Sequence, residues 1–242
     1  MGLKHEQTLE HFREALAELD ARSLPAPLRS RLAELWLERA QNEHASVASF
    51  DRFCLGLLAV GAPPELLESA HHAALDEVLH ARLCFAIASV YAREPMGPGP
   101  LPLAGALAAD FDLTALAVST ALEGCLGETL SALEAERCAE LAQPPAVKTA
   151  LEIIAKDEAA HAELAWAFLR FACEVGGEEA TRAVRESFGP ALRASAATAT
   201  KYACADPEVN GFGFLDPEQA VRVRQQALAE VLIPAAKALG LA

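Results

Sequence analysis

The sequence predicts an all-α protein that folds as one domain, residues 1–242, around four long antiparallel helices. Hydrophobic residues make up 52% of the chain, whereas Tyr and Trp occur only twice each. Runs of β-branched residues with strict alternation, which would indicate strands, are missing. Long stretches at the helical period are separated instead by proline- and glycine-rich segments at about 61–64, 94–102 and 143–145. A chain of 242 residues is long enough to bury one large core.

The elements are expected in a simple order along the chain. Residues 28–174 are expected to form the core, with 1–27 as an N-terminal covering segment and 175–242 as a C-terminal helical extension. Tight proline turns predict two antiparallel hairpins. Between them, the 17 residues of 94–110 span up to about 55 Å when extended, enough to cross about 40 Å of helix. Helices are expected over about 4–21, 28–60, 64–93, 113–142, 145–174, 178–197 and 217–238.

The strongest indication of function is the motif Asp-Glu-x-x-His, which occurs twice, 81 residues apart. Residues three apart lie on one face of a helix, so Glu77 with His80, and Glu158 with His161, can each bind one cation. Hydrophobic residues flank both copies at the helical period, which places these groups on or beside a buried face. A buried carboxylate is costly unless it is paired or binds a metal, and here that cost arises twice. The repeated motif therefore predicts a metal site.

A further glutamate lies on the first long helix. Glu43 comes seven residues after Trp36 and seven before Phe50, so it shares their apolar face. Glu43 lies 18 residues before Gly61, and Glu77 lies 16 after it. At about 1.5 Å per residue the two acids reach nearly the same height in the hairpin.

The third long helix offers two candidates for the matching acid. Glu123 precedes Glu158 by 35 residues, close to the spacing of 34 in the first hairpin, and is preferred over Glu128, which precedes it by 30. Both acids can face one site only through a π-bulge or a shift of the helix. Gly124 and Gly127 lie between them and either leave room for a small molecule or allow close helix packing.

Four carboxylates and two imidazoles from four helices are the donors of a di-iron or di-manganese carboxylate site. In these residues the sequence resembles the ferritin-like superfamily, which includes ferritins, rubrerythrins, ribonucleotide reductase small subunits, desaturases and bacterial monooxygenases. The resemblance covers about 28–174 and implies a ferritin-like antiparallel four-helix bundle with a long crossover between its second and third helices. It implies six ligands for two ions, with Glu77 and Glu158 bridging: Glu43, Glu77, His80, Glu123, Glu158 and His161.

The resemblance also assigns roles to residues beside these ligands. Asp76 would accept a hydrogen bond from His161, and Asp157 one from His80, which fixes the histidine tautomers. Cys84 stands four residues after His80, where ribonucleotide reductase small subunits usually carry a radical tyrosine. Some monooxygenase hydroxylases carry Cys there, and plain core packing is the alternative for Cys84.

The activity implied is that of an O₂-activating di-iron oxidase or oxygenase that acts on a small organic substrate and takes electrons from an external donor. Two iron ions are the expected cofactor, with manganese as the alternative, because the ligand types suit both. The C-terminal extension and the lack of Cys-x-x-Cys pairs favour this over a ferroxidase or storage protein for Fe²⁺, or a rubrerythrin-like peroxide scavenger. A non-catalytic metal-binding bundle is the third interpretation, and a homodimer is compatible with each.

Charge and segment composition limit the partners. The net charge of −14 argues against binding nucleic acid or an anionic membrane surface, both of which require clustered Lys and Arg. No run of about 18 apolar residues predicts a membrane span, and residues 1–6 are too polar for a secretory signal, so a cytoplasmic protein is expected. The six cysteines have no paired spacing and are expected to be free thiols.

Overall fold

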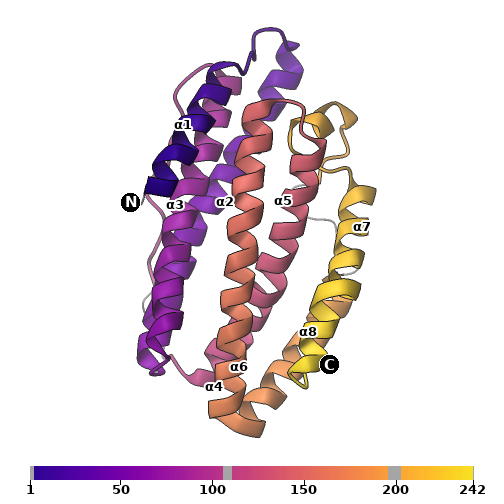
Figure 1. Ribbon diagram of the computed structural model, residues 1–242. Coiled ribbons are helices and arrows are strands. Elements are labelled where there is room, and N and C mark those ends of the chain that lie inside the picture. Colours follow the sequence, from indigo (N-terminus) through magenta and orange to yellow (C-terminus); the bar gives the residue numbers. More distant parts are fainter. Residues whose placement is uncertain (1–2, 106–110, 196–202, 242) are drawn as a thin grey trace.

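The computed structural model describes residues 3–105, 111–195 and 203–241, and over these ranges the chain is all-α, with no β-strand (Figure 1). The all-α part of the predicted fold class is thereby confirmed. Among the described residues, no helix combines the length and apolarity needed to cross a membrane. The elements are α1 (Leu3–Ala17), α2 (Ala26–Ala59), α3 (Pro64–Ala92), α4 (Leu113–Ser119), η1 (Thr120–Glu128), α5 (Thr129–Leu141), α6 (Pro145–Ser195), η2 (Pro207–Phe212), α7 (Pro217–Ala227), η3 (Leu228–Leu232) and α8 (Ile233–Ala238).

Helices α2 and α3 form an antiparallel hairpin whose turn is set by glycine and proline. Gly61 adopts φ 65°, a left-handed conformation that favours glycine, and the Ala62 N–H donates to the Leu57 carbonyl over 2.9 Å. Pro64 then opens α3, where a missing N–H has no consequence because the first turn leaves it unpaired. The second hairpin joins α5 to α6, which also begins on a proline, Pro145.

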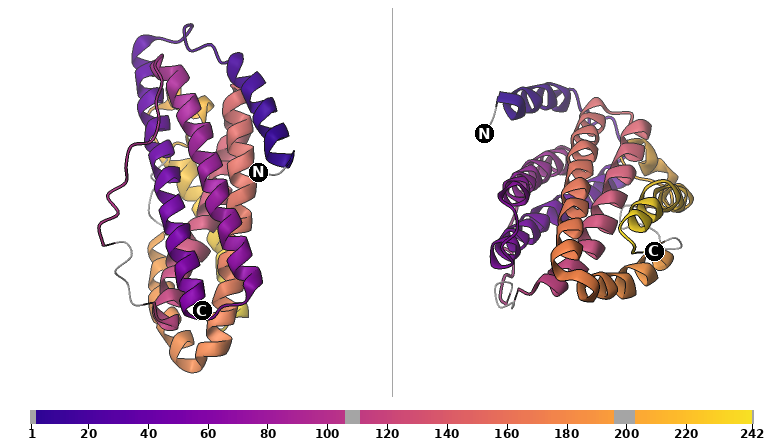
Figure 2. Two further views of the ribbon diagram at one scale, coloured as in Figure 1. Left: turned by 90° about the vertical axis from the view of Figure 1, so that its left-hand side faces the viewer. Right: turned by 60° about the horizontal axis from the view of Figure 1, so that its bottom comes forward.

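Helix α3 and the α4–η1–α5 segment run in the same direction, so the chain must return between them. α3 ends where Arg93 adopts a left-handed conformation, and α4 begins at the far end of the molecule (Figure 2). There Asp112 caps α4 by accepting from the backbone N–H groups of Thr114 and Ala115. Of the connection predicted over 94–110, residues 106–110 lie outside the described residues.

The long helices enclose two apolar cores that are separated along their length by a polar layer. One core contains Trp36, from α2, and Leu151, from α6. The other contains Phe50, from α2, and Phe168, from α6. The acids and histidines singled out on α2, α3 and α6 fall between these two sets of residues, so their side chains are shielded from water at both ends.

The C-terminal third folds back along the α5–α6 hairpin (Figure 1). Gly177 has non-helical angles, φ 59° and ψ −144°, and divides α6 into two helical parts, in line with the separate helices expected over 145–174 and 178–197. The second part contributes Phe188 to the core around Phe168. Arg224 of α7 donates to buried Glu134 of α5 over 2.8 Å, which gives that carboxylate the partner it needs.

Candidate metal centre

The structure brings four carboxylates and two imidazoles together in the middle of the molecule, in two overlapping groups. Within each group, one ligand atom from every residue lies within 4.8 Å of those from the others. The first group is Glu43, Glu77, His80 and Glu158, and the second is Glu77, Glu128, Glu158 and His161. Glu77 and Glu158 belong to both groups, so each carboxylate can serve two neighbouring ions.

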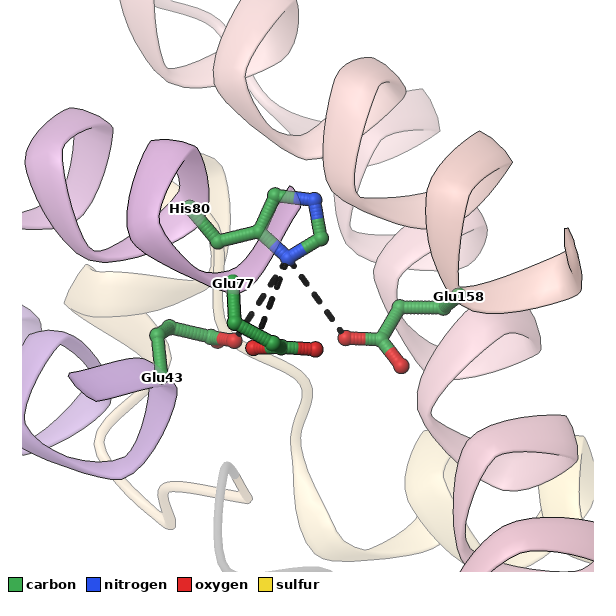
Figure 3. Close-up of side chains that lie close together, drawn as sticks. All are labelled: Glu43, Glu77, His80 and Glu158. Atoms are coloured by element: carbon green, nitrogen blue, oxygen red, sulfur yellow. Dashed lines mark ion pairs between the residues drawn. The ribbon is translucent and has the colours of Figure 1, made fainter. Parts of the chain in front are cut away.

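Around His80, three carboxylates converge on a single ring nitrogen (Figure 3). The Nδ1 atom lies 3.8 Å from Glu43 Oε2, 3.7 Å from Glu77 Oε2 and 3.8 Å from Glu158 Oε1. These separations are too long for hydrogen bonds, yet short enough for one cation to contact all four atoms. The His80 ring is fully buried and Glu77 is 1% exposed, so no water competes from bulk solvent.

His161 has matching surroundings on the opposite helix. Its Nδ1 lies 3.3 Å from Glu77 Oε1 and 3.9 Å from Glu158 Oε2. The edge of Phe50 packs against its ring, with centroids 4.9 Å apart, and holds the imidazole in place. The two histidine rings lie 6.0 Å apart and face the same carboxylates from two sides.

The outer nitrogen of each histidine contacts an aspartate from the other copy of the motif. His80 Nε2 lies 3.2 Å from Asp157 Oδ2, and His161 Nε2 lies 3.5 Å from Asp76 Oδ2. This is the crosswise arrangement that the resemblance implies. A carboxylate only accepts, so each Nε2 carries its hydrogen and donates it to the aspartate. With a metal ion bound, each ring would be neutral and would present its Nδ1 lone pair to that ion.

Four buried atoms at the centre have no hydrogen-bond partner: Glu77 Oε2, His80 Nδ1, Glu158 Oε2 and His161 Nδ1. They face one another in pairs, with Glu77 Oε2 3.7 Å from His80 Nδ1 and Glu158 Oε2 3.9 Å from His161 Nδ1. Buried polar atoms are nearly always satisfied, and leaving even one unpaired is destabilising. Protons or metal ions between these atoms would satisfy them.

The pKa values show how strongly these groups compete for positive charge. Burial lowers the pKa of His80, but hydrogen bonding to Asp157 and the charge of Glu77 outweigh it and raise that pKa to about 10. Burial would raise the pKa of Glu77, but the adjacent imidazoles outweigh it and lower the pKa to about 2. Burial, together with the charge of nearby Glu128, raises the pKa of Glu158 well above its usual value. Four ionised carboxylates would carry more negative charge than two imidazolium rings offset, and the raised pKa of Glu158 reflects this surplus. Divalent cations would balance it.

The fourth carboxylate comes from Glu128, whereas Glu123 is absent from both groups and is exposed. The structure therefore places Glu128, and not the preferred Glu123, beside the other potential ligands. The reason for the difference lies in η1, a π-helical segment in which hydrogen bonds run from i to i+5 and the turn is wider than in an α-helix. Five residues then return to nearly the same face, so Glu123 and Glu128 line the same two cavities, with Glu128 deeper.

The two glycines of η1 have different surroundings. A Cβ added at Gly124 would lie 2.6 Å from the Cβ of Ala165 on α6, so this glycine allows close packing of the two helices. A Cβ added at Gly127 would meet only the Leu122 carbonyl oxygen, at 3.7 Å. Close packing therefore explains Gly124, while Gly127 borders open space.

Two cavities reach the centre from different sides. One, of about 290 Å³, ends at Glu128 and His161 and is more apolar than polar, with Phe50 among its walls. The other, of about 180 Å³, is more polar and is lined by Glu43 and Glu158 together with Arg39. Small molecules thus have an apolar route to one side of the centre, and ions a polar route to the other.

Two further residues complete the surroundings. Cys84 belongs to the core around Trp36 and to neither carboxylate group, and burial together with Glu43 raises the pKa of its thiol, which stays protonated. All six cysteines are free.

Arg39 was not predicted as part of the site, although it lies one helical turn before Glu43. Its guanidinium is 2% exposed and stacks on Trp36 and Phe214, with distances of 5.3 and 5.6 Å to the ring centroids.

No known protein family, curated protein or solved structure matches this chain. Its function must therefore be inferred from the side chains themselves. The observation that carries most weight is the set of buried, inward-facing ligand atoms.

Proposed function

We propose that this protein is a ferritin-like four-helix bundle that binds two metal ions, most simply iron, and activates O₂ as an oxidase or oxygenase. In this bundle the helices would be α2, α3, α4–η1–α5 and α6. The single observation behind the proposal is that both histidines direct a buried Nδ1 without a hydrogen-bond partner toward shared carboxylates, while an aspartate contacts each Nε2.

The donor set fits a pair of hard or borderline divalent ions. Four carboxylates supply four negative charges, which two divalent ions neutralise, and the imidazoles then bind as neutral ligands. Glu43 and His80 would hold one ion, and Glu128 and His161 the other. Glu77 and Glu158, which belong to both groups, would bridge them. Manganese suits the same donors, whereas zinc would bind without offering redox chemistry.

The protein's own contribution is to position these ligands and to exclude water. Two bound iron ions would supply the electrons that reduce O₂. Asp157 and Asp76 keep the hydrogen of each histidine on Nε2, so that Nδ1 remains available. The apolar cores on both sides keep bulk water away, which strengthens every charge interaction inside.

The apolar cavity favours oxidation of an organic substrate over iron storage. It has about 290 Å³ of space that ends at Glu128 and His161, so a small organic molecule can reach the metal-facing side chains. A ferroxidase needs only a path for Fe²⁺, and the polar cavity already offers one. No redox group other than the metals is implied by the described residues, so electrons would come from an external donor.

Metal content and O₂ consumption test this proposal together. Purified protein reconstituted anaerobically with Fe²⁺ should hold two iron ions per chain, and His161→Ala should lose at least one. The exposed His72 gives a matched control, since His72→Ala should leave the content unchanged. O₂ consumption that needs an added organic compound supports an oxygenase, whereas consumption proportional to Fe²⁺ alone, with mineral formation, supports the ferroxidase. Wild-type protein with no tightly bound metal would refute both.

A further inference from the structure

The apolar cavity has a charged mouth and apolar walls between this mouth and its inner end at Glu128 and His161. Arg52 of α2 and Glu123 of η1 line it and are both exposed, so they belong to its mouth. Deeper in, the walls include Phe50, Leu116 and Leu164, each at most 9% exposed. The cavity therefore suits a molecule with a charged end toward solvent and an apolar body toward the centre.

The two charges at the mouth come from different helices and are not paired with each other. Among the described residues, no ion pair joins Arg52 to Glu123 or to any other acid, so the guanidinium and the carboxylate are both available. A guanidinium binds a carboxylate through two parallel hydrogen bonds, and a carboxylate accepts from an ammonium group. One ligand that carries both groups can bridge the mouth.

The charge of the whole chain favours a ligand with no net charge. At −14 the protein repels anions at long range, so a simple carboxylic acid would approach against the field and would also meet Glu123. A simple amine would be repelled at the mouth by the positive charge of Arg52. A zwitterion avoids both penalties because its two charges cancel at a distance and match the mouth at close range.

The interior volume limits the apolar body. A cavity of about 150 Å³ accommodates benzene, and this one has about 290 Å³. The body can therefore be a branched aliphatic chain or a single aromatic ring with its linker. A larger ring system would not fit without movement of η1, which packs closely on α6 at Gly124.

We propose that this cavity binds a free α-amino acid with a large apolar side chain, its carboxylate on Arg52, its ammonium group on Glu123, and its side chain directed toward Glu128 and His161. The inference rests on the proposed function only in taking this amino acid as the substrate. The two charged contacts, Arg52 and Glu123, belong to neither group of metal-facing residues.

Three related ligands separate the two charged contacts. L-Phenylalanine carries both groups, 3-phenylpropanoate lacks the ammonium group, and 2-phenylethylamine lacks the carboxylate. Isothermal titration of Mn²⁺-loaded protein should show that phenylalanine binds about tenfold more tightly than either of the others, since each of these lacks one of the two charge-assisted contacts. Equal binding of all three, or no binding of phenylalanine, would overturn the proposal.

Two variants identify the residue behind each contact. Arg52→Gln should weaken phenylalanine and phenylpropanoate about tenfold and leave phenylethylamine unchanged, and Glu123→Gln should weaken phenylalanine and phenylethylamine instead. Arg82→Gln and Glu163→Gln change exposed charges outside the cavity and should have no effect. A site for anions would bind phenylpropanoate more tightly than phenylalanine, and Glu123→Gln would then increase its affinity for phenylalanine. Both results together would refute the proposal that the cavity prefers a zwitterion.

Metal content measured on the same samples keeps the two proposals apart. Protein that holds two Mn²⁺ ions per chain but fails to bind phenylalanine would refute the amino acid and leave the metal centre standing. Protein that binds phenylalanine with the expected dependence on Arg52 and Glu123, but holds no metal, would support the cavity and refute the proposed function.

Discussion

One added methyl group at Gly124 should separate two helices beside the candidate metal centre. The new Cβ would lie 2.6 Å from Ala165 Cβ, and the helices must part by about 0.8 Å to reach the 3.4 Å at which ordinary contact begins. Overpacking of this kind lowers the free energy of unfolding by about 1–3 kcal/mol, and the better helix propensity of alanine offsets up to about 1 kcal/mol of this loss. Gly124→Ala should therefore lower the free energy of unfolding by about 1–2 kcal/mol.

Gly127→Ala is the matched control, because it adds the same methyl group three residues away with no close contact. It should raise the free energy of unfolding by up to about 1 kcal/mol. Urea unfolding of the metal-free proteins, followed by circular dichroism, measures both changes. With an m-value of about 2 kcal/mol/M, Gly124→Ala should lower the midpoint by about 0.5–1 M, and Gly127→Ala should leave it level or raise it.

The same pair tests the link from packing to the site. Ala165 lies one helical turn after His161, so parting η1 from α6 moves His161 away from Glu128. Gly124→Ala should then bind metal more weakly than Gly127→Ala in competition with a chelator. If both variants unfold at the wild-type midpoint, the close packing of η1 on α6 inferred here is wrong.

Three other changes test individual groups. Glu128→Gln should lower metal content below two ions per chain while Glu123→Gln keeps it, as measured by plasma emission; the reverse pattern would make Glu123 the ligand. Asp157→Asn should weaken metal binding about 10–100-fold in chelator competition, whereas Asp51→Asn, a change at an exposed position, should not. Equal metal affinities of the two variants would contradict the proposed role of Asp157. The pKa of His80 rises on folding from about 6.5 to about 10, so its contribution to the stability of metal-free protein is present below pH 6.5 and is lost as pH rises toward 10. Thermal unfolding should show a lower Tm at pH 10 than at pH 6, and a Tm that is unchanged or higher would contradict this pKa.

The sequence predicts the helices and most of the cluster because both depend on local spacing. The Glu-x-x-His pairs need only the i, i+3 geometry of a helix, and Glu43 needs only a shared height across a short hairpin. Proline and glycine mark the ends of α2, α3 and α5, so the predicted boundaries lie within a few residues of those observed.

Local spacing rules cannot decide whether Glu123 or Glu128 is the metal-facing carboxylate. A spacing argument assumes 3.6 residues per turn, and η1, which packs closely on the distant helix α6, departs from this value. Gly124 against Ala165 shows that packing directly. The cavity mouth was unpredictable for the same reason, since Arg52 and Glu123 line one cavity only in the folded chain.

Anomalous diffraction from crystals grown anaerobically with Fe²⁺ tests the central claim most directly. The account predicts two iron peaks per chain, one within bonding distance of His80 Nδ1 and one within bonding distance of His161 Nδ1, both in contact with Glu77 and Glu158. A single peak, a peak on the Nε2 side of either ring, or no peak between the two histidines would contradict it.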